Sequence, residues 1–197
     1  ALQVSALNDA AAAQGLVPGM PLATARAMLP ALEIIDADPV ADAKTLNAIA
    51  DWCDRFTPLV ALDGQDGLFL DITGCAHLFG GEAAMLRTIG RSLSDQGFIV
   101  NVAIAGTPVT ARAIAHTREQ QIVASGKEAA AVAPLPVSAL GADEKIVRGL
   151  QRAGLKTIGD VASRTPAEIT ARFGAAFTSL LQQALGLSDA PISPRKP

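Results

Sequence analysis

Residues 59–72 read LVALDGQDGLFLDI, which places two apolar runs on either side of two Asp-Gly pairs. An Asp-Gly pair between apolar runs is a strong signal for a tight β-hairpin, because Gly accepts the backbone angles of the turn. We therefore predict one strand over Leu59–Leu62 and a second over Leu68–Ile72. Helical spacing before and after this stretch predicts helices beside the hairpin, and hence an α+β fold.

The chain outside the hairpin alternates between helical and extended patterns up to about residue 126. Segments rich in Gly, Pro and Asp separate these patterns and predict turns. The predicted helices cover 3–14, 20–28, 40–56, 86–93 and 108–116, and the predicted strands cover 34–35, 98–105 and 122–124.

From Ala133 onwards the sequence loses its strand patterns. Residues 133–137 read APLPV and predict a linker. Gly or Pro separates four predicted short helices, over 143–153, 158–164, 166–173 and 175–186. The glycine turn between the first two of these helices is of a kind that presents backbone N–H groups to a phosphate.

The chain has 197 residues, a formal net charge of −3 and 50% hydrophobic residues, enough for one domain or two small ones. No run approaches the roughly 18 apolar residues of a membrane span, so we expect no membrane contact. Two Cys and two His argue against a disulfide scaffold and a structural zinc site. These features predict a reduced, cytoplasmic protein.

Charge is distributed unevenly along the chain. Residues 1–133 carry 8 basic and 14 acidic side chains, net −6, whereas residues 134–197 carry 8 basic and 5 acidic ones, net +3. Nine of the acids lie within 33–71. Such a cluster is a solvated face, a cation site or a surface that repels polyanions. The basic end is weak evidence for nucleic-acid binding.

Asp66, at the hairpin turn, is the candidate metal ligand, and Asp63 is close enough through the turn to be its partner. A divalent site for phosphoryl transfer needs at least two carboxylates together with substrate oxygens. Asp71 would lie on the opposite face of the strand from Asp66 and is no partner for it. A turn Asp also commonly caps its own backbone, so a purely structural role for Asp66 stays open.

Three groups of residues resemble the Y-family translesion DNA polymerases, the DinB/UmuC-like superfamily. They are GLVPGMP at 15–21 with Ala25–Pro30, QDGLFLDIT at 65–73, and AIA at 103–105 with Val109–Ala115, in the order and spacing of that family. The segments LDG at 62–64 and GCAHLFGG at 74–81 are most similar to its catalytically inactive ImuB-type branch. Members of that branch are polymerase-like subunits of a bacterial DNA-damage mutagenesis complex.

The resemblance implies three subdomains. Partial helical fingers would cover 1–37, a ferredoxin-like antiparallel palm sheet 38–126, and an all-helical helix-hairpin-helix thumb 134–190. The first palm strand, with the family's first metal-binding Asp, would precede Ala1. Residues 191–197 would begin a linker to a further C-terminal domain.

Four positions depart from the active members of the family. The active members have adjacent Asp and Glu in the palm, where this chain keeps the acid as Asp66 but has Gly67 in place of the Glu. Their Tyr and Arg, which hold the triphosphate, match Asp9 and Ala12. A Lys of the family matches Pro108. Removing one charge-stabilising group costs on the order of 10²–10³ in rate. The resemblance therefore implies no catalytic residue, with Asp66 as a remnant of the acidic site. It implies no cofactor either, or Mg²⁺ where some metal binding persists.

The helical end retains only part of the family's DNA-binding hairpin. Two glycines that let the backbone approach a DNA phosphate match Gly141 and Asp143, and a carboxylate opposes phosphate. The second turn keeps Gly154, Lys156 and Thr157, with three arginines in support, Arg148, Arg152 and Arg164. We expect weak, salt-sensitive contact with damaged or primer-template DNA.

Our main hypothesis is a catalytically silent adaptor subunit in bacterial DNA-damage-induced translesion synthesis and mutagenesis. By resemblance its partners are the sliding clamp, a RecA-like accessory protein and a separate error-prone replicative-type polymerase, and its location is the cytoplasm at the bacterial nucleoid. One alternative is an active Mg²⁺-dependent polymerase, a nucleotidyltransferase that uses Asp66 with Asp63. Another is a non-enzymatic DNA- or protein-binding module without polymerase ancestry.

Overall fold

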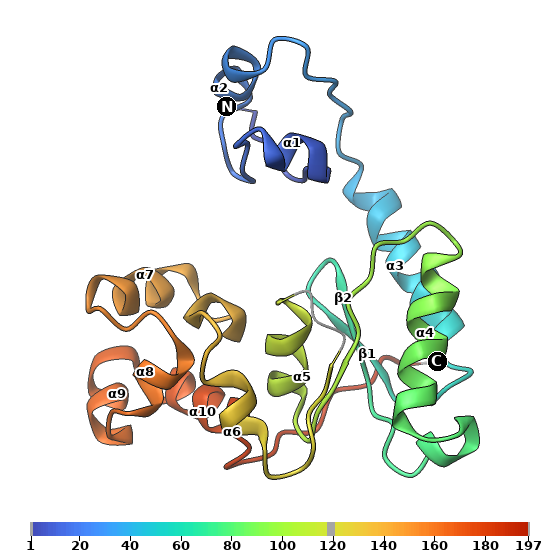
Figure 1. Cartoon of the computed structure of the whole chain (residues 1–197), viewed down its shortest axis with the longest axis vertical. Coiled ribbons are helices and arrows are strands. Elements are labelled where there is room, and N and C mark those ends of the chain that lie inside the picture. Colours follow the sequence, from blue (N-terminus) through green and yellow to red (C-terminus); the bar gives the residue numbers. More distant parts are fainter. Residues whose placement is uncertain (1, 118–120, 197) are drawn as a thin grey trace. The chain divides into compact units, whose positions relative to one another are not determined.

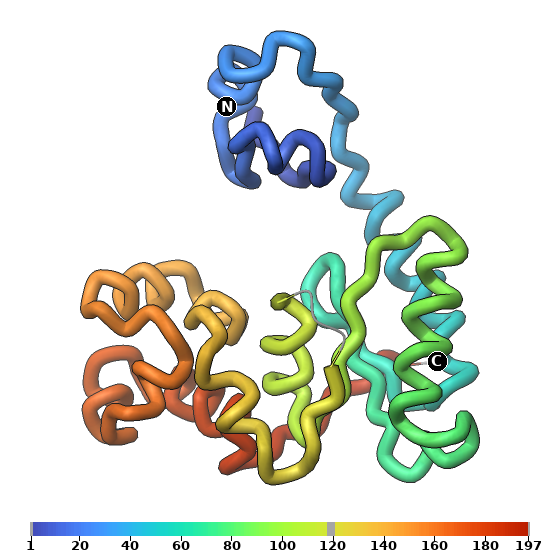
Figure 2. The backbone as a smooth tube through the Cα atoms, viewed as in Figure 1, coloured from blue at the N-terminus to red at the C-terminus, as the bar shows by residue number. Residues whose placement is uncertain are grey.

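The structure is a computed structural model that describes residues 2–117 and 121–196. The chain separates into two compact units, one up to Ala48 and one from Ile49 onwards. Figure 1 labels the α-helices and the strands β1 and β2, and Figure 2 traces the backbone. Helix α3, Pro39–Cys53, contributes to both units.

The first unit contains two short helices, α1 (Asp9–Ala13) and α2 (Leu22–Met28). Ahead of α1 the chain is extended, and Gln3 forms an antiparallel β-bridge with Pro21. The predicted helix over 3–14 is therefore wrong in its first half. Asn8 is the reason, because its side chain caps the helix by accepting the Ala11 N–H at 2.9 Å.

The segment before α3 corrects a second prediction. Residues 34–35 form no strand, and both isoleucines there are exposed. The Asp38 side chain accepts the N–H groups of Val40 and Ala41 and so starts α3. The helix ends at Cys53 rather than at the predicted residue 56.

The second unit begins with the predicted hairpin. Strands β1 (Val60–Asp63) and β2 (Gly67–Leu70) pair antiparallel, with Val60 opposite Leu70 and Asp63 opposite Gly67. Val60, Leu68 and Leu70 pack against the buried end of α3. A 3-10 turn, η1 (Ala76–Phe79), leads into α4 (Glu82–Ser94), which packs against the same hairpin. This confirms both strand predictions, and α4 is longer than predicted.

Two further strands are short and parallel. β3 (Ala103–Ile104) pairs with β4 (Gln121–Ile122), and α5 (Pro108–Ala115) connects them. Of the predicted strand 98–105 only residues 103 and 104 form a strand, and of the predicted strand 122–124 only residue 122 does, paired within a strand that begins at Gln121. The described residues thus form two separate two-stranded sheets instead of the single antiparallel sheet that was predicted. The second pair is parallel because a helix carries the chain back to the starting edge.

The helical end begins with α6 (Glu128–Val132) and the 3-10 turn η2 (Val137–Leu140). Four helices follow and confirm the four predicted ones: α7 (Glu144–Arg152), α8 (Ile158–Ala162), α9 (Pro166–Phe173) and α10 (Ala175–Ala184). α9 has the predicted bounds, and the other three are shorter than predicted. Their shared core includes Leu140, Leu150, Ile158, Val161 and Phe177.

Residues 133–137, predicted as a linker, are part of this packed body. The Gly159 N–H donates to the Ala133 carbonyl, and the Ile158 N–H donates to the Leu135 carbonyl, both at 2.9 Å. Val137 is fully buried. These bonds tie the segment to the start of α8, so the linker prediction is wrong.

Helix α5 joins the hairpin side to the helical end. The Thr107 hydroxyl donates to the Gln183 carbonyl at 2.8 Å, and the Thr110 hydroxyl donates to the Ala184 carbonyl at 2.9 Å. Ala113 completes the contact by entering the helical core. The predicted subdomain boundaries at 37, 126 and 134 stay predictions. Across the described residues, every helix falls short of the length and apolar character that crossing a bilayer requires.

Candidate functional site

The candidate site lies at the tip of the β1–β2 hairpin. A turn over residues 64–66 joins the strands, and Gly64 takes a φ of +64°, the left-handed value that favours glycine. The pairing of Asp63 with Gly67 brings one predicted ligand beside the position that matches the family's Glu. The Asp-Gly pattern therefore fixes the local geometry of the tip.

Asp63 is held by an arginine from a distant part of the chain. Its Oδ2 lies 3.2 Å from Nε of Arg112, on α5, and the two side chains are 17% and 32% exposed. Sequence reasoning did not find Arg112. The residues are 49 positions apart, and only the packing of α5 beside the hairpin brings them together. The Asp63 carboxylate is thus neutralised by a fixed cation.

Arg112 also lies against the helical end. A Cβ atom added to Gly141, at the end of η2, would come within 2.6 Å of the Arg112 guanidinium carbon. Gly141 takes a φ of +69° as the C-cap of η2. The predicted phosphate-approaching glycine therefore serves a turn and makes room for the arginine that pairs with Asp63.

Gly67 is closely surrounded. A Cβ added there would lie 2.9 Å from the Asp63 carbonyl oxygen, 3.1 Å from its Cβ and 3.2 Å from its Oδ2. The first of these distances is shorter than real Cβ contacts allow, and the backbone atom cannot move without disturbing the strand pair. Any larger residue at position 67, the family's Glu included, would displace Asp63.

Asp66 is exposed on the turn, with its Oδ1 about 4.0 Å from the place of a Cβ on Gly64. Asp71 has a structural role, because its side chain accepts the Thr73 N–H at 2.9 Å, and hydrogen bonds from Thr73 lower the pKa of its carboxyl. Within 2–117 and 121–196, no three His, Cys, Asp or Glu side chains gather as a metal-binding group.

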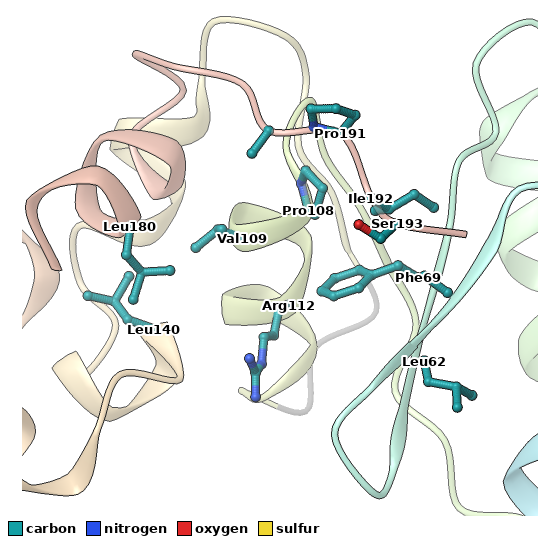
Figure 3. A pocket seen from close by; sticks show the side chains of 12 residues that line it. Leu62, Phe69, Pro108, Val109, Arg112, Leu140, Leu180, Pro191, Ile192 and Ser193 are labelled. Atoms are coloured by element: carbon teal, nitrogen blue, oxygen red, sulfur yellow. The ribbon is translucent and has the colours of Figure 1, made fainter. Parts of the chain in front are cut away.

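A pocket of about 270 Å³ lies beside this tip. Figure 3 shows Phe69 pointing from β2 toward α5, with Arg112 below it and Pro191, Ile192 and Ser193 along one side. Its lining is mainly apolar. The sequence offered no signal for the pocket, since its walls come from β1, β2, α5, the helical end and the C-terminal segment.

The second predicted site, the turn before α8, has its amides occupied from within. Oδ2 of Asp160 accepts the Lys156 N–H at 3.0 Å and the Thr157 N–H at 2.8 Å. The Thr157 hydroxyl in turn accepts the Asp160 N–H, which completes a capping box. Hydrogen bonds from Thr157 lower the pKa of the Asp160 carboxyl. The Gly154 N–H donates to the Gln151 carbonyl. The turn stabilises α8 and offers no free amide cradle at these positions.

The predicted basic residues of this region lie on the surface. Arg148 pairs with Glu144 one turn earlier on α7, at 3.3 Å. Arg152, Lys156 and Arg164 are exposed. At the start of α7, the Asp143 side chain accepts the Lys145 N–H at 2.7 Å and so fills the N-terminus of the helix with a carboxylate. Any phosphate contact here would therefore come from side chains.

Residues 2–116 match the impB/mucB/samB family (IMS). The chain is 44% identical over 184 residues to Protein ImuB of Caulobacter vibrioides (strain NA1000 / CB15N), a match that covers 93% of this chain and 40% of that protein. It is 27% identical over 194 residues to DNA polymerase IV of Dehalococcoides mccartyi (strain CBDB1), covering 96% of this chain and 50% of that protein. Among solved structures, DinB from Sulfolobus solfataricus matches with a TM-score of 0.79 at 19% identity, covering 98% of this chain and 58% of that one.

The sequence matches and the fold together place the chain among Y-family proteins. The chain belongs to the impB/mucB/samB family and is ImuB-like within it, which confirms the predicted resemblance. The alternative of a module without polymerase ancestry is wrong. The chain spans 40 to 50% of the length of the curated relatives named above.

Proposed function

We propose that the chain is part of a catalytically silent Y-family polymerase-like adaptor subunit in bacterial DNA-damage-induced translesion synthesis and mutagenesis. Its similarity to Protein ImuB supports this reading. A second relative is named DNA polymerase IV, so DNA is the substrate class that the proposal assigns. Because the chain spans at most half of either relative, the activity and partners of the whole protein belong to the proposal.

The ion pair at the hairpin tip is the observation that carries the proposal. Two-metal phosphoryl transfer needs carboxylates that are free to hold divalent cations. Asp63 faces the Arg112 guanidinium at 3.2 Å, so its charge is already neutralised by a group that a cation would have to displace. Gly67 supplies no carboxylate and leaves no room for one. These residues do not fit a Mg²⁺ site, and we propose that the hairpin holds no catalytic metal.

The subdomain assignment is part of the same proposal. Residues 1–37 would be fingers, 38–126 the palm and 134–190 a helix-hairpin-helix thumb. The two helices that flank Gly154 and the capped turn between them support the thumb assignment. Residues 191–197 would begin the linker to a further domain. Partners would be the sliding clamp, a RecA-like accessory protein and an error-prone polymerase, in the bacterial cytoplasm.

DNA contact in this proposal is weak and made by side chains. Asp160 occupies the amides of the second turn, and Asp143 occupies the start of α7. Arg152, Lys156 and Arg164 remain exposed to meet phosphates. A triple change of these three residues to Ala should weaken binding to a primer-template several-fold for every sequence and flatten the salt dependence. A gel-shift series across salt concentrations measures both quantities.

Primer extension tests the silent active site. The full-length protein that contains this chain is incubated with primer-template, nucleotides and Mg²⁺ or Mn²⁺, beside a DNA polymerase IV as positive control. We expect no extension above the no-enzyme level, and no gain from Gly67→Glu. Extension at a rate like that of the control, lost in Asp66→Asn or Asp63→Asn, would establish the active-polymerase alternative instead.

A further inference from the structure

The C-terminal segment after α10 is extended and crosses the hairpin side of the second unit. Residues 190–196, here called the strap, contain neither helix nor strand. Pro191, Ile192 and Ser193 form one side of the pocket that Phe69 and Arg112 also line (Figure 3). The strap therefore covers the side chains of the hairpin and of α5 that line this pocket.

Arg195 fixes the far end of the strap at three points. Its backbone N–H donates to the Val60 carbonyl at 2.8 Å. Its guanidinium forms a hydrogen-bonded ion pair with Asp51, and Nη2 donates to Oδ2 of Asp54 at 2.6 Å. Asp51 lies in the last turn of α3, and Asp54 directly follows the last residue of that helix, so both carboxylates are available to one side chain at its end. One planar guanidinium thus bridges two carboxylates.

The backbone contact caps an exposed strand edge. Among the described residues, β1 pairs with β2 as its one strand neighbour, and the Val60 carbonyl accepts the Arg195 N–H. An unpaired edge strand is a template for pairing with other chains, and covering it with a loop is a common protection. The strap provides this cover at Val60.

The ion pairs of Arg195 with Asp51 and Asp54 are open to competing ions, whereas a change of pH in the physiological range leaves the charge of Arg195 unchanged. The two carboxylates raise the pKa of Arg195, so the guanidinium stays cationic throughout the physiological range. Asp51 and Asp54 are 71% and 48% exposed, so salt or another cation reaches them. Within the described chain, Nε of Arg195 is buried without a hydrogen-bond partner. That unpaired donor opposes the closed state.

We propose that the strap is a latched cover, with Arg195 as its anchor, and that its release uncovers the outer edge of β1 and the pocket beside Phe69. In the closed state the ion pairs to Asp51 and Asp54 hold the strap, and the Val60 contact seals the edge. In the open state the strap detaches while the hairpin and helices stay folded. This device is independent of catalysis and of DNA contact.

Amide hydrogen exchange, read by NMR on the chain, tests the latch. Arg195→Ala should speed exchange at the amide of residue 195, whose N–H donates to the Val60 carbonyl, about tenfold or more, because the side-chain bonds that hold this segment are lost, and should leave the helical core unchanged. Lys196→Ala removes a neighbouring cation for which no ion pair is found among the described residues, and should exchange like wild type. High salt should speed exchange of the wild-type strap and leave Arg195→Ala unaffected.

A charge exchange separates the latch from a general loss of fit. Arg195→Glu alone should open the strap, and Arg195→Glu combined with Asp51→Arg and Asp54→Arg should restore protection at the amide of residue 195. Wild-type exchange rates in Arg195→Ala, or equal effects of Arg195→Ala and Lys196→Ala, would overturn the proposal. Failure of the charge exchange to restore any protection would also overturn it.

Discussion

A carboxylate has a different kind of partner at the tip of the β1–β2 hairpin and at the turn before α8. At the hairpin, Asp63 faces the Arg112 guanidinium, a cation carried in from another element. At the turn, Asp160 accepts two backbone N–H groups of its own loop. In both places the group that would meet a ligand, a metal at the first and a phosphate at the second, is already paired inside the protein.

The difference lies in what each pairing builds. The contact at the turn is local, since Asp160 lies within four residues of both donors, and it sets the start of α8. The contact at the hairpin is long-range and joins β1 to α5. Local pairing of a carboxylate therefore stabilises an element, whereas long-range pairing fixes how elements pack and removes a candidate metal ligand.

The largest effect is expected in the core that carries the turn. Leu150 is fully buried in α7, and Leu150→Ala should lower the free energy of unfolding by about 2–5 kcal/mol through lost burial and a residual cavity. Leu187→Ala, at an exposed leucine, should change it by less than about 0.5 kcal/mol. Chemical denaturation measures both. Similar small effects for the two variants would contradict the packed helical end.

Loss of the long-range ion pair between Arg112 and Asp63 should have the second-largest effect on the free energy of unfolding. Arg112→Ala leaves the largely buried Asp63 carboxylate without its cation and should cost about 1–3 kcal/mol of unfolding free energy. Arg91→Ala, at an exposed arginine on α4, should be close to neutral. If Arg112→Ala lowers the free energy of unfolding in denaturant no more than Arg91→Ala does, the ion pair does not stabilise the packing of α5 against the hairpin.

The local cap should have a smaller effect. Thr157→Ala removes the hydroxyl that accepts the Asp160 N–H and should cost about 0.5–2 kcal/mol, the usual range for an N-cap. Thr157→Ser keeps the hydroxyl and should retain most of the stability. Equal losses in Ala and Ser variants, measured by thermal or denaturant unfolding, would show that the cap is not what Thr157 contributes.

Acidification should give the smallest of these changes in the free energy of unfolding. Bonds from Thr157 hold the pKa of Asp160 below 3.8, and bonds from Thr165 hold that of Glu168 below 4.5. Because both pKa values are lowered by folding, their stabilisation is complete above about pH 4.5 and is lost as the pH falls below these values. Unfolding measured between pH 6 and pH 3 should show this loss. Asp160→Asn should reduce the slope, and an unchanged slope would count against the capping role.

Much of the fold could be predicted from local chemistry. The Asp-Gly pairs predicted the hairpin, and the Gly and Pro positions of the helical end predicted four helices. The errors arose where a distant partner decides the structure. The predicted linker over 133–137 is bound to α8 by backbone hydrogen bonds, and the parallel strand pair depends on the path through α5.

The candidate site shows the same division. Asp66 and Asp63 were identified from residue type and turn spacing, and their place at one hairpin tip follows from that spacing. Arg112 was missed because it lies 49 positions from Asp63 in the sequence, and no local pattern indicates that the two residues form an ion pair. Asp160 was missed as an internal acceptor, although Thr157 followed by Asp160 has the spacing of a capping box. The strap anchor, Arg195 with Asp51 and Asp54, depends wholly on tertiary structure.

Manganese binding to the full-length protein tests the central claim most directly. Mn²⁺ is titrated into the protein, and free Mn²⁺ is followed by electron paramagnetic resonance, with Asp63→Asn and Asp66→Asn as comparison variants. The account predicts no saturable site that depends on Asp63, because Arg112 already neutralises that carboxylate. A saturable site in the wild type that both variants abolish would contradict it.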